Sequence, residues 1–229
     1  MNSPEVLYED NHIIAVNKQP SDIVQGDKTG DKPLSEYVKE YLKIKYNKPG
    51  EVFLGTIHRI DRPVSGVVVF ARTSKALARL NEMFREREVQ KTYWAVVKNK
   101  PAHEAGSIIH YLKKNEAKNL SKAFDKEISG SSKAELDYKI LSSSTNYHLL
   151  EIKPITGRHH QIRVQLSAIG CPIKGDVQYG FKRTNENASI HLHAIKIEFI
   201  HPVQKESIII TANPPKDVLW DEFLRLLSK

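Results

Sequence analysis

An acidic residue flanked by two arginines is the first feature of the sequence that could do chemistry. Residues 58–62 read His-Arg-Ile-Asp-Arg, and an apolar run of strand length, 67–71, follows closely. Nearby positive charge favours the ionised form of a carboxylate. An ionised and positioned Asp61 suits nucleophilic or electrostatic work at a sugar or a base. The pattern is more often a surface turn with a salt bridge, so the residues alone leave both interpretations open.

A second segment, 156–163, places basic and amide side chains at the start of a predicted helix. It reads Thr-Gly-Arg-His-His-Gln-Ile-Arg. The first N–H groups of a helix attract anions, whereas positive side chains at that end oppose the helix dipole. A bound carboxylate or phosphate would account for the basic residues, and a solvated helix start is the alternative.

A third segment, 169–180, contains three glycines and a proline around Asp176. This composition predicts a rigid loop, for which a purely structural use is the commoner case. Asp176 would then either bind a metal or orient an arginine. Ten histidines invite a zinc interpretation, but the single cysteine, Cys171, and the absence of ligand spacing predict no metal site.

The bulk composition favours a polyanionic partner. The 229 residues carry a formal net charge of +8, and basic surfaces bind phosphates by releasing condensed counterions. Six lysines fall in one short, poorly patterned stretch, and they are candidates either for contact with a nucleic-acid backbone or for a solvated loop: Lys113, Lys114, Lys118, Lys122, Lys126 and Lys133. No apolar run reaches about 18 residues, so no membrane partner is expected. One cysteine fits a reducing compartment, which predicts a cytoplasmic protein.

Hydrophobic periodicity predicts the elements that must position these segments. Strands are expected over 6–8, 13–18, 67–71, 92–98, 107–112, 134–142, 146–155, 189–200 and 207–212, with 51–57 extended. Helices are expected over 33–46, from an N-cap at Ser74 to about 87, from about 159 to 169, and after Pro214-Pro215. This order predicts an α+β fold with a mostly antiparallel, mixed β-sheet and flanking helices. We expect one domain over 1–229, in which 99–133 forms an inserted arm.

Together, four ordered segments resemble the RluA type of pseudouridine synthase. The first is 58–71, with Asp61 followed by Ser-Gly and an apolar strand. The others are Lys91-Thr92-Tyr93, the Gly-Arg-His-His-Gln-Ile-Arg of 157–163, and the glycine-rich loop 170–180. The opening, 7–20, also fits, so the resemblance covers about 5 to 212. Four residues depart from the family pattern, and we expect them to bear on substrate preference: Val64, His159, Gln165 and Cys171.

The resemblance implies the pseudouridine synthase catalytic-domain fold and isomerisation of specific uridines in structured RNA. It implies Asp61 as the catalytic carboxylate, Arg163 as the cation that pairs with it, and Tyr93 as an active-site aromatic that stacks on the uracil. The reaction breaks and rejoins one bond within a nucleotide, so no cofactor is expected. The family pattern begins near residue 5, so no separate N-terminal RNA-binding domain is expected.

The resemblance also implies how RNA is bound. A stacked uridine must flip out to be reached, and Arg59 matches the residue expected to fill the vacated place. Further substrate contacts are expected from neighbours in the same motifs: His58, Arg62, Arg158 and Gln161. Ribosomal RNA and transfer RNA are both open as substrates, and a monomer is the default.

Two rival functions follow from the same residues. A hydrolase would use Asp61 and Asp176 as a carboxylate pair, close together and without a dominant arginine partner. A non-catalytic RNA-binding module would keep its function after Asp61→Asn. The ordered motifs favour the synthase over both.

Overall fold

The computed structural model describes residues 3–27 and 29–228, which divide into two compact units. Unit 1 takes the chain up to Gln90 together with Ala194–Pro214, and unit 2 takes Lys91–His193 together with the chain from Pro215. Each unit therefore contains two separate stretches of sequence. A single domain over residues 1–229 stays a prediction.

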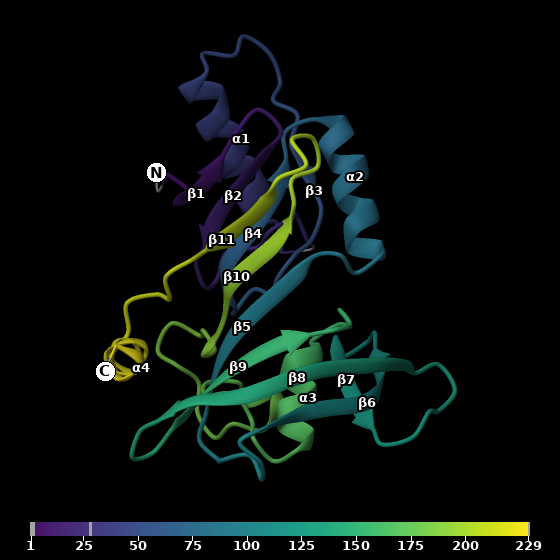
Figure 1. The fold of residues 1–229 in the computed structure, drawn as a ribbon, viewed down its shortest axis with the longest axis vertical. Coiled ribbons are helices and arrows are strands. Elements are labelled where there is room, and N and C mark those ends of the chain that lie inside the picture. Colours follow the sequence, from purple (N-terminus) through teal and green to yellow (C-terminus); the bar gives the residue numbers. More distant parts are fainter. Residues whose placement is uncertain (1–2, 28, 229) are drawn as a thin grey trace. The chain divides into compact units, whose positions relative to one another are not determined.

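Unit 1 is a mostly antiparallel sheet with two helices (Figure 1). Its strands follow the order β1 (Val6–Glu9), β2 (Ile13–Lys18), β4 (Ser65–Ala71), β10 (Leu192–Ile200) and β11 (Ser207–Thr211), and the short β3 (Gly55–Thr56) also pairs with β4. The helices are α1 (Leu34–Lys45) and α2 (Ser74–Arg85). Of the predicted extended stretch 51–57, only two residues form a strand.

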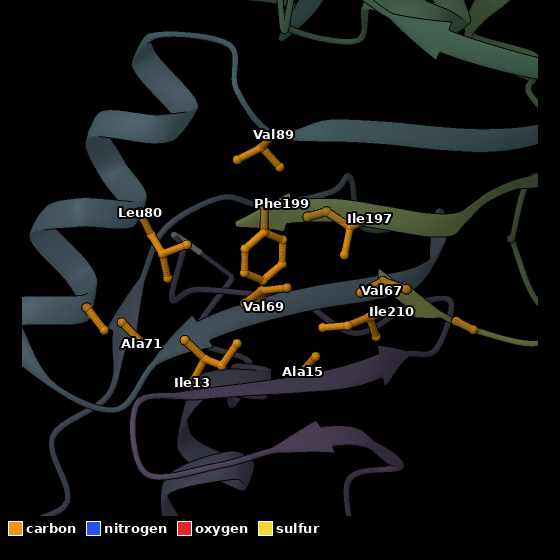
Figure 2. Packing of buried hydrophobic residues seen from close by; sticks show 12 residues of the cluster. Ile13, Ala15, Val67, Val69, Ala71, Leu80, Val89, Ile197, Phe199 and Ile210 are labelled. Carbon is orange, nitrogen blue, oxygen red and sulfur yellow. The ribbon is translucent and has the colours of Figure 1, made fainter. Parts of the chain in front are cut away.

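The core of unit 1 lies between one face of this sheet and α2. Alternate residues of β2, β4 and β10 point the same way, because side chains along a strand alternate between faces. Figure 2 shows Ile13, Val69 and Phe199 from these three strands meeting Leu80 of α2. Thr73 caps α2, since its side chain accepts a hydrogen bond from Ala76 N, so the predicted cap at Ser74 is wrong by one residue.

Unit 2 contains five antiparallel strands (Figure 1). Its strands follow the order β5 (Gln90–Val97), β9 (His148–Pro154), β8 (Ser132–Ser143), β6 (Ala105–Asn115) and β7 (Leu120–Phe124). The predicted arm at 99–133 contains the β6–β7 hairpin, and β6 pairs along most of its length with β8. The arm is therefore built into the sheet of unit 2.

The two faces of this sheet are covered differently. Helix α3 (Gln161–Ala168) packs on one face, where Val164 meets Leu112 and Ala134. Helix α4 (Val218–Leu227) packs on the other face, where Trp220 and Phe223 meet Val96 and Leu149. On the α4 face, the helix covers β5, β9 and part of β8, whereas the residues of β6 and β7 on this face are exposed or partly exposed.

Two helix starts differ from their predictions. Helix α3 begins at Gln161, because His160 before it adopts a left-handed conformation with φ 53°. Helix α4 begins after Asp217, whose side chain accepts hydrogen bonds from Leu219 N and Trp220 N, whereas Pro214-Pro215 lie before the helix. The predicted end of α3 at Gly170 is confirmed: Gly170 has φ 77°, and Cys171 N returns to Leu166 O at 2.9 Å.

Among the described residues, no helix is long and apolar enough to cross a membrane.

Candidate active site

The loop that carries Asp61 lies between β3 and β4 in unit 1. Asp61 is half-buried, and its carbonyl oxygen accepts a hydrogen bond from Val64 N at 3.0 Å, which closes a turn. His58 fixes the start of the loop, since its Nε2 accepts from Val69 N of β4 at 3.0 Å and its ring stacks on Phe84 of α2. The loop therefore leaves β3 with the His58 side chain anchored to β4 and α2, and the turn from Asp61 to Val64 leads it into β4.

A buried lysine holds the end of this loop. Lys18, at the end of β2, is fully buried, and its Nζ donates to the carbonyl oxygens of Gln19, Arg62 and Val64 at 2.9, 3.1 and 2.7 Å. An ammonium group has three N–H donors, so these three carbonyls use all of them. Two of the acceptors lie just after Asp61, and Lys18 thus fastens the Asp61 loop to the sheet.

The charge of Lys18 also matters to Asp61. Burial lowers the pKa of Lys18 to about 7, and the carboxylates of Asp22 and Asp61 oppose this by favouring the charged amine. The loop thus presents Asp61 near a buried cation that the sequence analysis did not assign.

Gly66 lets the Asp61 loop enter β4 tightly. Its φ is 120°, a conformation that side chains disfavour, and an added Cβ would lie 2.3 Å from the carbonyl oxygen of Ala194 in β10. Gly66 also pairs with Lys18 in the β2–β4 register. Only glycine fits between these two strands at this point.

The arginines beside Asp61 point to separate tasks. Arg59 and Arg62 are both exposed. Arg62 Nη2 forms an ion pair with Asp31, and the hydrogen bond from Arg62 holds the pKa of Asp31 below its usual value. Arg62 thus forms a surface salt bridge, which was one of the two interpretations that the sequence left open for this motif. Asp61 itself is held in place by the loop. The predicted substrate contacts of His58, Arg59 and Arg62 stay predictions.

In unit 2, Arg163 is held through its side chain. Its Nε and Nη2 donate to the two carboxylate oxygens of Asp176 at 2.7 and 2.9 Å, and Nη2 also donates to Gln178 at 2.8 Å. The guanidinium lies 5.0 Å from the centre of the Tyr179 ring. The Arg163 and Asp176 side chains are only 3% and 1% exposed. A two-point contact of this kind fixes both the position and the orientation of an arginine.

This contact settles the role of Asp176 among those left open by the sequence, because Asp176 orients an arginine. The loop that carries it is pinned to β5 by hydrogen bonds such as Lys174 N to Val96 O at 2.9 Å. At Gly175, φ is 88° and an added Cβ would lie 2.7 Å from Ser189 O, so the turn requires glycine. The dominant arginine partner argues against the hydrolase alternative, which needed Asp176 as an unpaired acid.

The turn before α3 is tied to the β6–β7 hairpin by a chain of hydrogen bonds. Tyr179 Oη accepts from Ser121 N of β7 at 2.9 Å and lies 2.8 Å from His160 Nδ1. Ser121 Oγ donates to His159 O at 2.8 Å. Since the Tyr179 ring also packs on Arg163, the hairpin, the turn and the arginine form one connected group.

Gln161 and Arg158, both predicted to bind substrate, have structural contacts in this turn. Gln161 Oε1 accepts from Thr156 Oγ1 and Arg158 N at 2.8 and 2.9 Å, and its Nε2 donates to Glu135 O. These bonds replace a side-chain cap at the start of α3. Arg158 is exposed, and its Nε donates to Lys133 O at 3.1 Å. Their substrate contacts stay predictions.

Tyr93 lies on the face of the unit 2 sheet that α3 covers. In the register, Tyr93 pairs with Ile152, which pairs in turn with Tyr138 of β8, and paired residues share a face. Lys91 lies two residues earlier on the same face, and its Nζ lies 3.9 Å from the position of an added Cβ at Gly157. Burial lowers the pKa of Lys91.

The predicted site residues thus form two groups. His58, Arg59, Asp61 and Arg62 share one loop of unit 1, and the rest lie in unit 2 around the α3 side of its sheet: Tyr93, Arg158, Gln161 and Arg163. The pairing of Asp61 with Arg163 joins residues of different units and stays a prediction.

Sequence reasoning missed Lys18 and underrated Tyr179 and Gln178. Lys18 could have been noticed in the sequence, because it is the last residue of an apolar strand and stands directly before Gln19-Pro20. A lysine at the end of a buried strand is placed close to the core. Of the four departures from the family pattern, Val64, Gln165 and Cys171 are buried, so they fill the interior rather than a binding groove.

Comparison with known proteins places the chain in a family. Residues 12–168 match the family model of RNA pseudouridylate synthase. A tRNA pseudouridine synthase C of Haemophilus influenzae is 32% identical over 96% of this chain and 96% of its own length. A ribosomal large subunit pseudouridine synthase C of Buchnera aphidicola is 33% identical over 97% of this chain and 70% of its own length.

The fold agrees with this family. The solved structure of human RNA pseudouridylate synthase domain containing 4 superimposes with a TM-score of 0.79, at 24% identity, over 98% of this chain and 93% of that one. The predicted α+β class with a mostly antiparallel, mixed β-sheet and flanking helices is confirmed. The chain belongs to the RNA pseudouridylate synthase family and is an RNA-modifying isomerase.

Proposed function

We propose that this protein converts specific uridines of a transfer RNA or a ribosomal RNA to pseudouridine, with Asp61 as its catalytic carboxylate. One observation carries the assignment of Asp61: a loop fastened by the fully buried Lys18 presents this acid half-exposed beside a buried positive charge. Family membership supplies the reaction class, and the names of relatives include both RNA classes.

The reaction needs no atom from outside the nucleotide. The bond between the ribose C1′ and N1 of uracil breaks, the base turns, and C1′ bonds to C5. The proton lost from C5 is balanced by the proton gained at N1. No redox step or group transfer occurs, so the proposal includes no cofactor. Asp61 acts first, either at the sugar or at the base, and the same carboxylate serves either route.

Three residues of unit 2 complete the proposed site. Arg163, held by Asp176 through Nε and Nη2, would use the Nη1 side of its guanidinium to hold Asp61 charged and aimed. Tyr93 would stack on the uracil and help to remove the proton from C5. Its place on the α3 side of the sheet, where Arg163 also originates, supports this role.

The target uridine must leave the stack of an RNA helix, at a cost of a few kcal/mol. The exposed Arg59 is proposed to fill the vacated place, while His58 holds the loop in position. Arg62, Arg158 and Gln161 are proposed to contact the RNA or to shape its binding site. A monomer in the cytoplasm remains the default for this activity.

The decisive experiment deletes the gene and maps pseudouridine across all cellular RNA. Rescue with wild type should restore a lost position, and rescue with Asp61→Asn should not. Purified wild-type protein should then modify a transcript containing that position without added cofactor. Restoration by Asp61→Asn would instead support the non-catalytic RNA-binding module. No lost position, combined with no activity on transcripts, would overturn the proposal.

A further inference from the structure

The exposed end of the unit 2 sheet carries a group of basic and aromatic side chains that the proposed reaction does not use. In the β6–β7 register, Lys113 lies opposite Lys122 and Tyr111 opposite Phe124. In the β6–β8 register, Tyr111 lies opposite Lys133. Residues directly opposite, and those two apart along a strand, share a face. We call these five residues the basic face.

The basic face points away from α3. The intervening residues of the same strands, Leu112 and Ala123, pack with Val164 of α3 on the opposite side. Lys113, Lys122 and Lys133 are all exposed, and the Tyr111 and Phe124 rings are partly exposed. Helix α4 covers this side of the sheet around Val96, Leu149 and Leu141, which belong to β5, β9 and β8. Figure 1 shows β6 and β7 at the end of the sheet away from α4.

The arrangement of charge on this face opposes the stability of the hairpin. Like charges directly across two strands repel each other, and Lys113 faces Lys122. The compensation present is small: Lys113 Nζ donates to Ser129 O at 3.0 Å, and Lys122 Nζ lies 5.3 Å from the centre of the Phe124 ring. Only Lys133 has an acidic partner, Glu135 at 2.8 Å. A ligand carrying regularly spaced negative charge would relieve this repulsion.

The aromatic rings select among polyanions. A duplex hides its bases in the stack, whereas an unpaired strand offers base faces that stack on aromatic side chains while lysines meet its phosphates. The basic face interleaves two rings with three lysines and therefore fits an unpaired strand. Arg158, exposed and bonded to Lys133 O, connects this face with the turn before α3.

We propose that the basic face binds a single-stranded segment of the RNA substrate that flanks the target uridine. This inference rests on the proposed function, since it assigns a second contact region to the same RNA. Lys113, Lys122 and Lys133 neutralise phosphates, and Tyr111 and Phe124 stack on unpaired bases. The surface contributes binding and leaves the isomerisation step to the site around Asp61.

The test measures binding of a short fluorescent oligouridylate to the full chain as salt is varied. The double variant Lys113→Gln/Lys122→Gln should reduce the salt slope of log K by about 1.4, from two lost phosphate contacts. The variant Tyr111→Leu/Phe124→Leu should weaken binding roughly tenfold or more at constant salt. The matched control, Lys114→Gln/Lys118→Gln, removes the same charge from positions off the basic face and should change the slope much less.

Two further measurements separate this inference from the proposed function. With the RNA transcript at saturating concentration, the lysine double variant should keep the wild-type single-turnover rate, while Asp61→Asn should lose it. If Asp61→Asn keeps the wild-type single-turnover rate, the proposed chemistry is contradicted, whereas the proposal for the basic face is not affected. Equal loss of oligouridylate binding in the lysine variant and its control would overturn the basic face as a specific surface.

Three other outcomes would also overturn the proposal or part of it. Preference for a duplex RNA over the single strand would overturn the single-stranded assignment. Unchanged oligouridylate binding in both the lysine and the aromatic variants would overturn the proposal. So would loss of binding to anionic phospholipid vesicles in these variants with RNA binding unchanged, because the face would then serve a membrane surface. Circular dichroism of each variant must show the wild-type fold for these comparisons to count.

Discussion

Asp61 and Arg163 are the two proposed charged residues of the active site, and the fold holds them in different ways. Asp61 is held through its backbone, because Lys18 fastens the carbonyls of Arg62 and Val64 and leaves the carboxylate half-exposed. Arg163 is held through its side chain, because Asp176 and Gln178 accept from the guanidinium itself. The acid thus depends on the placement of a loop, and the arginine on the partners of its own side chain.

Because of this difference, substitutions around Arg163 and substitutions of Lys18 should have different effects on the protein. Loss of a partner of Arg163 leaves a buried charge uncompensated, which is among the most costly changes in a protein. Loss of Lys18 removes a buried charge that is itself costly, but it leaves carbonyl oxygens without donors. We expect damage to the arginine group to appear mainly in stability, and damage to the loop to appear in both stability and the position of Asp61.

Asp176→Ala should have the largest effect. It leaves the Arg163 guanidinium buried without its two-point partner and should lower the free energy of unfolding by about 3–5 kcal/mol. The matched variant Gln178→Ala removes one hydrogen bond from the same guanidinium and should cost about 1 kcal/mol. Urea unfolding of both variants measures the difference. If Asp176→Ala costs no more than Gln178→Ala, the two-point contact does not hold Arg163.

Lys18→Met should have the next largest effect. Methionine fills a similar volume but donates no hydrogen bond, so the three carbonyl oxygens around Nζ lose their partners, and the loss should be about 1–3 kcal/mol. Lys75→Met, at an exposed position of α2, is the control and should leave stability near that of wild type. Amide hydrogen exchange should show faster exchange at Val64 and Ser21, on either side of the lost contacts. Unchanged exchange there would contradict the fastening role of Lys18.

The contribution of Lys18 should also depend on pH. Its pKa is about 7 in the folded chain, below the ordinary 10.5. Between these values the unfolded chain binds more protons, so the Lys18 contribution to stability rises with pH in this window. The rise is at most about 1.4 kcal/mol per pH unit, and hydrogen bonds to three carbonyls reduce it by favouring the charged amine. Unfolding at about pH 7 and about pH 9 should show a rise in wild type that Lys18→Met lacks.

Arg62→Gln should have the smallest effect on stability. Arg62 and its partner Asp31 are both exposed, so the melting temperature should not change measurably. If Arg62 contacts RNA as predicted, log K for the transcript should lose about one unit of salt slope. A lower melting temperature with an unchanged slope would reverse this assignment and make Arg62 a structural residue.

Regular elements were predictable because they follow local pattern. The buried strand Ile13–Lys18 and the helix Leu34–Lys45 are confirmed close to their predicted bounds, since their apolar residues repeat at strand and helix spacing. The caps and first residues of the helices were not predictable in this way, because they depend on which side chain reaches a backbone group. Thr73 rather than Ser74 caps α2, and Asp217 rather than the proline pair begins α4.

The candidate site was predictable only in part. The motif containing Asp61 was identified because it resembles a family pattern together with three other ordered segments, whereas its charged residues alone also fit a surface turn. The partners of each charge were not visible, because they come from distant positions: Lys18 lies far in sequence from Val64, and Ser121 of the hairpin lies far from His159. Contacts of this kind are set by the register of strands, which no local pattern encodes.

The division of unit 1 into two stretches of sequence has a consequence for its synthesis. Phe199 and Ile210 complete the core over β4, yet they leave the ribosome only after the whole of residues 91–193. At ordinary elongation rates this delay is on the order of ten seconds. During that time β4 lacks β10, its neighbour along one edge, and only the short β3 pairs there. Because an unpaired strand edge is a template for aggregation, we expect the nascent chain to be most prone to aggregate before β10 and β11 emerge.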